Sequence, residues 1–111
     1  MSGHSGIWEI PTARTDIKVH PGCIIYHGVQ IGTGCKIQAG CILVPGVRLD
    51  KYVFLGPGVI FTNVKRPSAL RKQEFLETHV EIGATIGAGA IILPGITIGE
   101  FAMVGAGAVV T

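Results

Sequence analysis

Between Val19 and Phe61, a large apolar residue returns at every sixth position of the chain. The members of this series are Val19, Ile25, Ile31, Ile37, Leu43, Leu49, Leu55 and Phe61. Four positions after most of them stands a small or β-branched residue: Cys23, Val29, Cys35, Cys41, Val47, Val53 and Val59. Helices repeat every 3.6 residues or so and strands every two, so this period fits neither as a single long element. A fixed six-residue period predicts a solenoid, and specifically a parallel β-helix.

In such a solenoid, three hexads close one triangular coil. Side chains alternate between the inside and the outside of each short strand, so the apolar residues of the hexad share one interior. The backbone groups of each coil pair with the coils above and below, at a spacing of roughly 4.8 Å. The predicted fold class is therefore all-β, a single-stranded parallel β-helix of hexapeptide repeats with one extruded loop. By analogy with other solenoids of this period, we expect it to be left-handed.

Composition agrees with a single domain of this kind. The 111 residues include 17 glycines and are 48% hydrophobic, which is too apolar for a disordered chain and too rich in glycine for helices. No apolar run is long enough for a membrane helix and the N-terminus lacks a signal-peptide layout, so we expect a cytoplasmic protein without a membrane partner. The net charge of +2 is small and dispersed, which gives no electrostatic reason to expect a nucleic-acid partner.

The three cysteines, Cys23, Cys35 and Cys41, all take the small inward position of their hexads. We expect buried, reduced thiols in the core. Cys23 and Cys41 are one coil apart and should stack on the same face. Because no paired Cys-x-x-Cys spacing is present, we expect no zinc site and no other metal.

The phase of the repeat divides the chain into four segments. Residues 1–18 keep the period weakly and are expected to form an N-terminal end or cap, with Trp8 covering the core. Regular coils occupy 19–63, an extruded loop 64–79, and further coils 80–111. The second set of coils restarts at Val80, one residue out of phase with the first.

The predicted loop has no hexad phase. It carries the cations Lys65, Arg66, Arg71 and Lys72 and is interrupted by Pro67. A loop extruded from an otherwise regular solenoid is costly to order, which favours a functional role, and the alternative is a tolerated solvated insertion.

Residues that stand three hexads apart should stack along the axis of the coil. His27, Pro45 and Asn63 are expected in one such column, and His20, Gln38 and Gly56 in another. A histidine in a turn points outward, so His20 and His27 are either solvated turn residues or contacts to a substrate in an outer groove. No nucleophile elbow, phosphate loop or metal-binding histidine pair is present, and any site must lie in a groove of the surface. Because so small a solenoid leaves much apolar surface open, we expect a homotrimer with ligand sites between subunits.

Three runs of the sequence carry a family resemblance. They are Val53-Phe-Leu-Gly-Pro-Gly-Val-Ile-Phe-Thr-Asn63, Glu74-Phe-Leu-Glu-Thr78, and the glycine- and alanine-rich repeats from Gly83 to Thr111. Together with the basic loop, they resemble the hexapeptide acyltransferases that N-acetylate nucleotide-linked 3-amino sugars. The resemblance implies a homotrimer in which acetyl-CoA, the co-substrate, lies in a groove between two β-helices. It also implies that Asn63 contacts the amino sugar, a small-molecule amine acceptor.

The implied reaction is attack of an amine on the thioester carbonyl of acetyl-CoA. It requires an oriented amine, a donor for the oxyanion and a route for one proton. Asn63 is expected to orient the amine through its side-chain oxygen, and His27 and Gln38 to contact the substrate. A diphosphate would meet Lys65, Arg66 and Arg71. The cofactor is expected to contact the glycine- and alanine-rich turns, namely Gly83, Ala88, Gly89, Ala106 and Gly107.

The proton has two possible routes. His79 precedes the final repeats, where the serine O-acetyltransferases of the same fold have an essential histidine, so it is a candidate general base. Alternatively, the leaving thiolate or water takes the proton and Asn63 only positions the amine.

Two other functions remain open at this level. One is a catalytically silent trimeric binding or assembly module, because the family continues beyond the equivalent of Thr111 with a segment that helps to bind CoA. The other is a metal enzyme of the γ-carbonic-anhydrase type, which needs three converging histidines, and His20, His27 and His79 lack its spacing.

Overall fold

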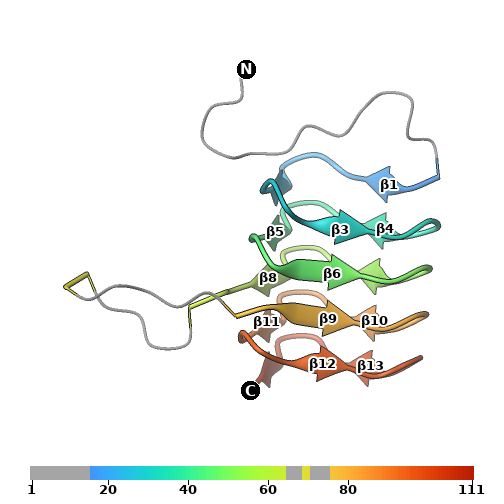
Figure 1. Cartoon of the computed structure of the whole chain (residues 1–111). Coiled ribbons are helices and arrows are strands. Elements are labelled where there is room, and N and C mark those ends of the chain that lie inside the picture. Colours follow the sequence, from blue (N-terminus) through green and yellow to red (C-terminus); the bar gives the residue numbers. More distant parts are fainter. Residues whose placement is uncertain (1–15, 65–68, 71–75) are drawn as a thin grey trace.

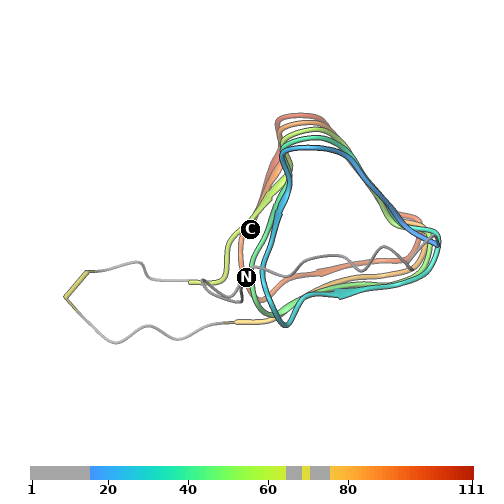
Figure 2. The same ribbon diagram turned by 90° about the horizontal axis from the view of Figure 1, so that it is seen from above.

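The computed structural model of the chain describes residues 16–64, 69–70 and 76–111. The described residues form fourteen short strands that wind into stacked triangular coils (Figures 1 and 2). Their pairing is parallel and gives three sheets, each of which makes one face of the triangle. The predicted all-β hexapeptide-repeat β-helix is confirmed.

The three faces contain every third strand of the chain. The first face consists of β1 (Lys18–Val19), β4 (Lys36–Ile37), β7 (Phe54–Leu55), β10 (Thr85–Ile86) and β13 (Met103–Val104). The second face consists of β2 (Ile24–Ile25), β5 (Ile42–Leu43), β8 (Ile60–Phe61), β11 (Ile91–Ile92) and β14 (Val109–Val110). The third face consists of β3 (Gln30–Ile31), β6 (Val47–Leu49), β9 (Thr78–Val80) and β12 (Thr97–Ile98).

Three corners join these faces. The first corner, between the first and second faces, holds residues 20–23, 38–41, 56–59, 87–90 and 105–108. The second corner, between the second and third faces, holds residues 26–29, 44–46, 62–64, 76–77 and 93–96. The third corner, between the third and first faces, holds residues 32–35, 50–53, 81–84 and 99–102.

The coil is left-handed. Figure 2 views the coils from the end where β1 lies, and the chain runs anticlockwise around the triangle as it moves away from the viewer. This is opposite to the hand that β-strand crossovers generally prefer. The hand that was expected by analogy is thus present in the structure.

The inward and outward residues of each strand alternate as the hexad predicts. In β4, for example, Ile37 is completely buried while Lys36 is exposed. The buried core runs from Ile17 to Ile98, and its largest fully buried side chain is Phe61. In the last coil, Val104 and Val110 are partly buried and pack against it. Later coils use Ala84 and Ala90 where earlier ones use cysteine or valine. The apolar period therefore supplies one continuous interior.

The register of the strands shows how much chain is inserted. Lys36 pairs with Phe54, which stands three hexads further along the chain. Phe54 in turn pairs with Thr85, which stands five hexads and one residue further along. The insertion therefore amounts to two hexads and one residue, and this explains why the repeat resumes out of phase.

Strand pairing resumes at Thr78, which points inward and pairs with Val47 of the coil above. The predicted coils restart only at Val80. The extruded segment therefore returns to the coil two positions before the predicted boundary.

All three cysteines are free thiols, and each donates to a backbone carbonyl 15 residues further on. Cys35 and Cys41 are buried and Cys23 is partly buried. Burial raises the pKa of Cys41 to about 11, so this thiol stays protonated at neutral pH. The prediction of reduced core thiols is confirmed for Cys35 and Cys41, while Cys23, in the first coils, is less covered.

Several expectations concern residues outside the described ranges. They are residues 1–15 of the cap predicted at 1–18, including Trp8, and the loop cations Lys65, Arg66, Arg71 and Lys72. The end of that predicted cap already belongs to the coil, because Ile17 is buried in the core and Lys18 begins β1. In the part of the chain that the structure describes, no helix is long and apolar enough to cross a membrane.

Candidate functional site

The second corner is where the regular coil is interrupted. Asn63 follows β8 there, and its side-chain Nδ2 donates a hydrogen bond of 3.1 Å to the carbonyl oxygen of Pro45. Pro45 stands three hexads earlier, directly above Asn63, and the pairing of β2 with β5 and of β5 with β8 extends this column to His27. The predicted column of His27, Pro45 and Asn63 is confirmed.

Backbone hydrogen bonds fix the base of the insertion. The N–H of Leu76 donates to the carbonyl of Asn63 at 2.9 Å, and the N–H of Thr78 donates to the carbonyl of Gly46 at 3.0 Å. The chain therefore leaves and re-enters the coil at neighbouring positions of the second corner. Asn63 is held on both its main chain and its side chain.

This arrangement leaves one functional group of Asn63 for a ligand. The amide nitrogen must face the Pro45 carbonyl, because two oxygens would repel at that distance. The side-chain Oδ1 then points elsewhere, and within the described residues no donor to it is present. An oxygen in this position can accept a hydrogen bond from a ligand N–H.

Two hollows border Asn63. A groove of about 990 Å³ runs along the second corner over Val44, Leu93 and Ile96 as far as Thr111. A second hollow of about 490 Å³ lies on the other side, against Tyr26 and Leu76. The walls of both are mainly apolar, so Asn63 is a polar group at the junction of two apolar surfaces.

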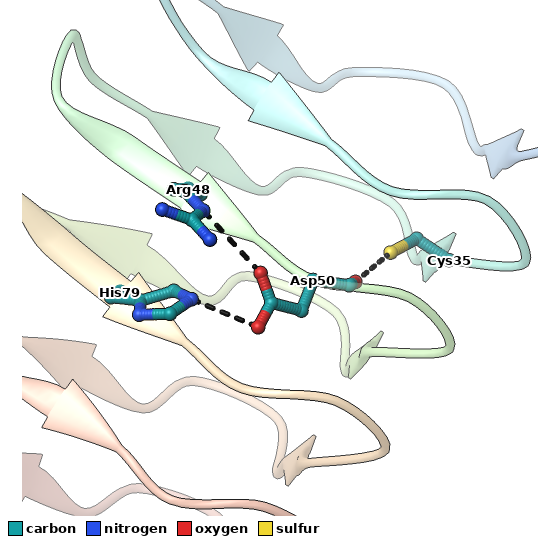
Figure 3. A network of polar contacts seen from close by, with 4 residues as sticks. All are labelled: Cys35, Arg48, Asp50 and His79. Carbon is teal, nitrogen blue, oxygen red and sulfur yellow. Dashed lines mark hydrogen bonds and ion pairs between the residues drawn. The ribbon is translucent and has the colours of Figure 1, made fainter.

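His79 lies on the third face rather than in the loop. It is the middle residue of β9 and points outward, in register with Arg48 of β6 and Thr97 of β12. Its Nε2 lies 2.9 Å from Oδ2 of Asp50, and Nε of Arg48 lies 3.4 Å from the other oxygen of that carboxylate (Figure 3). The side chains of His79 and Asp50 are 30% and 28% exposed, so the pair is partly shielded from water.

The hollow beside His79 is separate from those at Asn63. It measures about 350 Å³ and is lined by Gln30, Arg48, Glu77, His79 and Thr97, among others. Gly46 and Glu77 also line the 490 Å³ hollow of Asn63, so the two hollows adjoin across these residues. The structure thus places Asn63 and His79 on either side of one edge.

The residues predicted to contact the cofactor divide between two corners. Ala88, Gly89, Ala106 and Gly107 are exposed together at the first corner. Gly83 lies at the third corner, where a Cβ would come within 2.3 Å of the Phe101 ring, so its glycine is explained by packing. Gln38, which was predicted to contact the substrate together with His27, lies at the first corner, one coil below His20. It is therefore remote from His27, which lies at the second corner.

The tight stacking of coils explains the glycines of the first corner. A Cβ on Gly56 would lie 2.7 Å from the backbone nitrogen of Ala88, and one on Gly87 would lie 2.5 Å from that of Ala106. The N–H groups of Gly89 and Gly107 donate to the carbonyls of the coil above. Those of Ala88 and Ala106 donate to no group in the described part of the chain. At the first corner, two backbone N–H groups without a backbone acceptor in the described residues therefore stand one coil apart, each next to a glycine of the coil above.

Asp50 and Arg48, the partners of the candidate residue His79, were not indicated by any sequence motif. The signal was present in the phase shift, because an insertion of two hexads and one residue brings His79 directly under Arg48. Asp50 is the next outward residue of that coil. The three histidines are far apart: His20 lies at the first corner, His27 at the second corner and His79 on the third face. Within residues 16–64, 69–70 and 76–111, no group of three side chains that could hold a metal ion occurs.

Known proteins share both the repeat and the fold of this chain. Residues 77–111 match the model of the bacterial transferase hexapeptide (six repeats), and residues 22–45 match the hexapeptide repeat of succinyl-transferase. No curated protein sequence matches the chain.

Among solved structures, the chain is similar to perosamine N-acetyltransferase from Caulobacter crescentus in complex with CoA and GDP-perosamine. For one mutant of that enzyme the identity is 27% and the TM-score 0.61, and the match covers 87% of this chain and 43% of that one. A second mutant gives 26% identity and a TM-score of 0.51, with the same coverage.

A mutant of AntD, an N-acyltransferase from Bacillus cereus in complex with dTDP and coenzyme A, has 18% identity and a TM-score of 0.51. That match covers 85% of this chain and 73% of AntD, and it shows a shared fold. The chain spans less than half the length of the perosamine enzyme. In repeat and in fold, the chain is therefore a hexapeptide-repeat protein of the left-handed β-helix type, similar to N-acyltransferases that are bound to CoA.

Proposed function

We propose that this protein is an acyl-CoA-dependent acyltransferase that moves an acetyl group from acetyl-CoA to an amino group of a nucleotide-linked sugar. The observation that carries the proposal is Asn63, whose Nδ2 is held by the Pro45 carbonyl at the one interruption of the described coils. The similarity to an N-acetyltransferase in complex with CoA and GDP-perosamine supports the same chemistry.

Asn63 supplies orientation. An amine that donates one N–H to its Oδ1 is fixed at the junction of the two hollows, with its lone pair directed away from the amide. Holding a nucleophile in this way near its electrophile removes much of the entropic cost of the reaction. The amine nitrogen then attacks the thioester carbon, the C–N bond forms, the C–S bond breaks, and one proton leaves the nitrogen for the sulfur, directly or by way of water or a side chain.

The first corner supplies contacts for the acyl donor. The N–H groups of Ala88 and Ala106 are about 4.8 Å apart along the axis, which is the spacing of the coils. The amides of the pantetheine arm can accept from these two donors as the arm runs along the corner. Gly89 and Gly107 lie beside them, with their own N–H groups used between coils. Acetyl-CoA is the proposed co-substrate, and no step requires a metal.

A homotrimer would join the two halves of the site. In one chain, the first and second corners lie at opposite ends of the second face, so Ala88 and Asn63 do not meet. The outer residues of this face form one aliphatic column, whose members are Ile24, Ile42, Ile60, Ile91 and Val109. A second copy packed on this column would cover exposed apolar surface and bring its own corner beside Asn63. The cations Lys65, Arg66 and Arg71 are proposed to bind the diphosphate of the sugar nucleotide.

The test compares Asn63→Ala with Lys36→Ala, a variant of an exposed residue on the first face. Thiol release is measured with acetyl-CoA and GDP-perosamine or related amino-sugar nucleotides, and binding of acetyl-CoA by calorimetry. We expect Asn63→Ala to lower kcat/KM on the order of 100-fold while acetyl-CoA still binds, because only the amine loses its partner. Lys36→Ala should keep wild-type turnover.

Two outcomes would contradict the proposal. Unchanged turnover in Asn63→Ala removes Asn63 from the site. Absence of acetyl-CoA binding by the wild-type protein contradicts the transferase assignment as a whole and favours a silent binding or assembly module.

A further inference from the structure

We propose that Asp50 is a positioning residue that orients His79 to accept the proton of the attacking amine. This inference rests on the proposed function, because it concerns the proton route of that reaction. It adds a residue that no motif of the sequence indicates, and it decides between the two proton routes in favour of a side chain.

The geometry of the carboxylate carries the first step. Asp50 lies just after β6, and its two oxygens face two different side chains of the third face. Oδ2 is 2.9 Å from Nε2 of His79, and Oδ1 is 3.4 Å from Nε of Arg48 (Figure 3). Arg48 therefore contacts one oxygen of the carboxylate, and the other oxygen faces the imidazole.

The burial of the His79 Nε2 atom indicates which ring nitrogen can exchange a proton with a ligand. This nitrogen is shielded from solvent, and the 2.9 Å contact with Asp50 is not aligned well enough to be a hydrogen bond within the described structure. Only the carboxylate is near enough to take up its proton, so a small rotation of the ring places N–H of Nε2 on Oδ2. The second ring nitrogen, Nδ1, then carries the lone pair. Proton exchange with a ligand must pass through Nδ1, because Nε2 is inaccessible.

The surroundings place this base next to the amine. The hollow of His79 adjoins the hollow of Asn63 across Gly46 and Glu77. His79 stands where the third residue after Asn63 would stand if the coil were uninterrupted, since Pro45 and Arg48 occupy those positions in the coil above. Three residues of extended chain span at most about 10 Å, so a sugar amine can bridge the two side chains, directly or by one water.

Charged groups approach His79 from two neighbouring strands. Arg48 and Asp50 approach from β6 and the turn after it, and Glu77 and Glu81 flank β9 in the chain. From β12, the residue opposite His79 is the uncharged Thr97. Of these groups, the Asp50 carboxylate lies nearest to the imidazole, and it faces Nε2. The proton that Nδ1 takes from the amine then passes to the departing thiolate, so the products are the amide and the free thiol and His79 is restored.

The main test uses Asp50→Asn, with Glu100→Gln as the matched loss of a carboxylate at the exposed third corner. Asp50→Asn should fold, because the Asp50 main chain is held separately: its N–H donates to the Val80 carbonyl and its carbonyl accepts from the Cys35 thiol. We expect kcat to fall roughly tenfold or more with KM and acetyl-CoA binding unchanged. Glu100→Gln should leave kcat unchanged, and Asp50→Glu should restore part of the loss.

A second readout is independent of turnover. Nitrogen-15 NMR of the His79 ring should show the Nε2–H tautomer in the wild-type protein and a mixture of tautomers in Asp50→Asn. A wild-type protein that transfers acetyl groups while Asp50→Asn keeps both its kcat and its tautomer overturns the role of Asp50 and leaves the proposed function intact. A wild-type protein with no transfer at all overturns the proposed function and, with it, any catalytic use of the pair.

Discussion

The second and third faces share one construction on the inside and differ on the outside. Inside, both present fully or nearly fully buried apolar residues, such as Phe61 on the second face and Leu49 on the third. Outside, the second face carries a column of isoleucine and valine, whereas the third carries Gln30, Arg48, His79 and Thr97. Since the fold needs only the inner residues, the outer ones are free to differ, and the two faces present different surfaces.

The difference between the outer sides of the two faces suggests a different partner for each. Ile24, Ile91 and Val109 of the second face are 39%, 36% and 59% exposed, which is unfavourable in water unless another surface covers them. The third face instead holds a carboxylate between an imidazole and a guanidinium. We infer that the second face binds a neighbouring subunit and that the third face borders the substrate, with Asn63 at the corner between them.

The largest effect is expected where the two faces are alike. Phe61→Ala and Leu49→Ala should each lower the free energy of unfolding by about 3–5 kcal/mol, because both remove a buried side chain and leave a cavity. Gln30→Ala, on the outside of the third face, should change it by less than about 0.5 kcal/mol. Urea denaturation followed by circular dichroism measures all three, and a small loss at either buried position would show that the inner sides are not equivalent.

A smaller effect is expected where the faces differ. Ile60→Glu puts a charge in the aliphatic column and should raise the dissociation constant of the proposed homotrimer at least about tenfold. The matched variant Gln30→Glu, on the outside of the third face, should leave association unchanged. Sedimentation velocity over a range of concentrations gives the stoichiometry. A wild-type protein that is monomeric at all concentrations would contradict the role of the second face.

The smallest effect concerns an exception within the third face. Thr78 points inward, is almost completely buried, and its hydroxyl has no hydrogen-bond partner among the described residues. Thr78→Val keeps the shape and removes the unpaired hydroxyl, so it should raise the free energy of unfolding by about 1 kcal/mol. Thr78→Ser keeps the hydroxyl and should be destabilising. Thermal denaturation compares the three proteins, and a less stable Thr78→Val would mean that the hydroxyl is satisfied in solution.

The fold could be predicted almost completely because the hexad is a local rule. Each large residue from Val19 to Phe61 marks a position that points into the core. Any three consecutive hexads close one coil, whatever lies elsewhere in the chain. The column of His27, Pro45 and Asn63 followed from that arithmetic, and the hydrogen bond between Asn63 and Pro45 agrees with it. The roles of the site residues stay predictions.

The arrangement around His79 could not be predicted with the same rule. His79 seemed to end a loop, because the hexad counts only apolar residues and Thr78, which starts β9, is polar. The surroundings of Gly83 depended on Phe101, whose ring packs against it. Phe101 adopts a left-handed backbone conformation (φ 55°) that residues other than glycine rarely take. Such contacts join residues of different coils and leave no periodic trace.

The sequence by itself determined the stacked coils, the inward set of side chains and the place of the single interruption among residues 16–64, 69–70 and 76–111. Burial of one apolar residue in every six is enough to fix all three. The tertiary structure alone decided that Asp50 meets His79 and that Ala88 is separated from Asn63 by an aliphatic face. Outward side chains contribute little to the stability of the coil, so their partners follow from the register across the insertion and from the turn geometry, which no local pattern encodes.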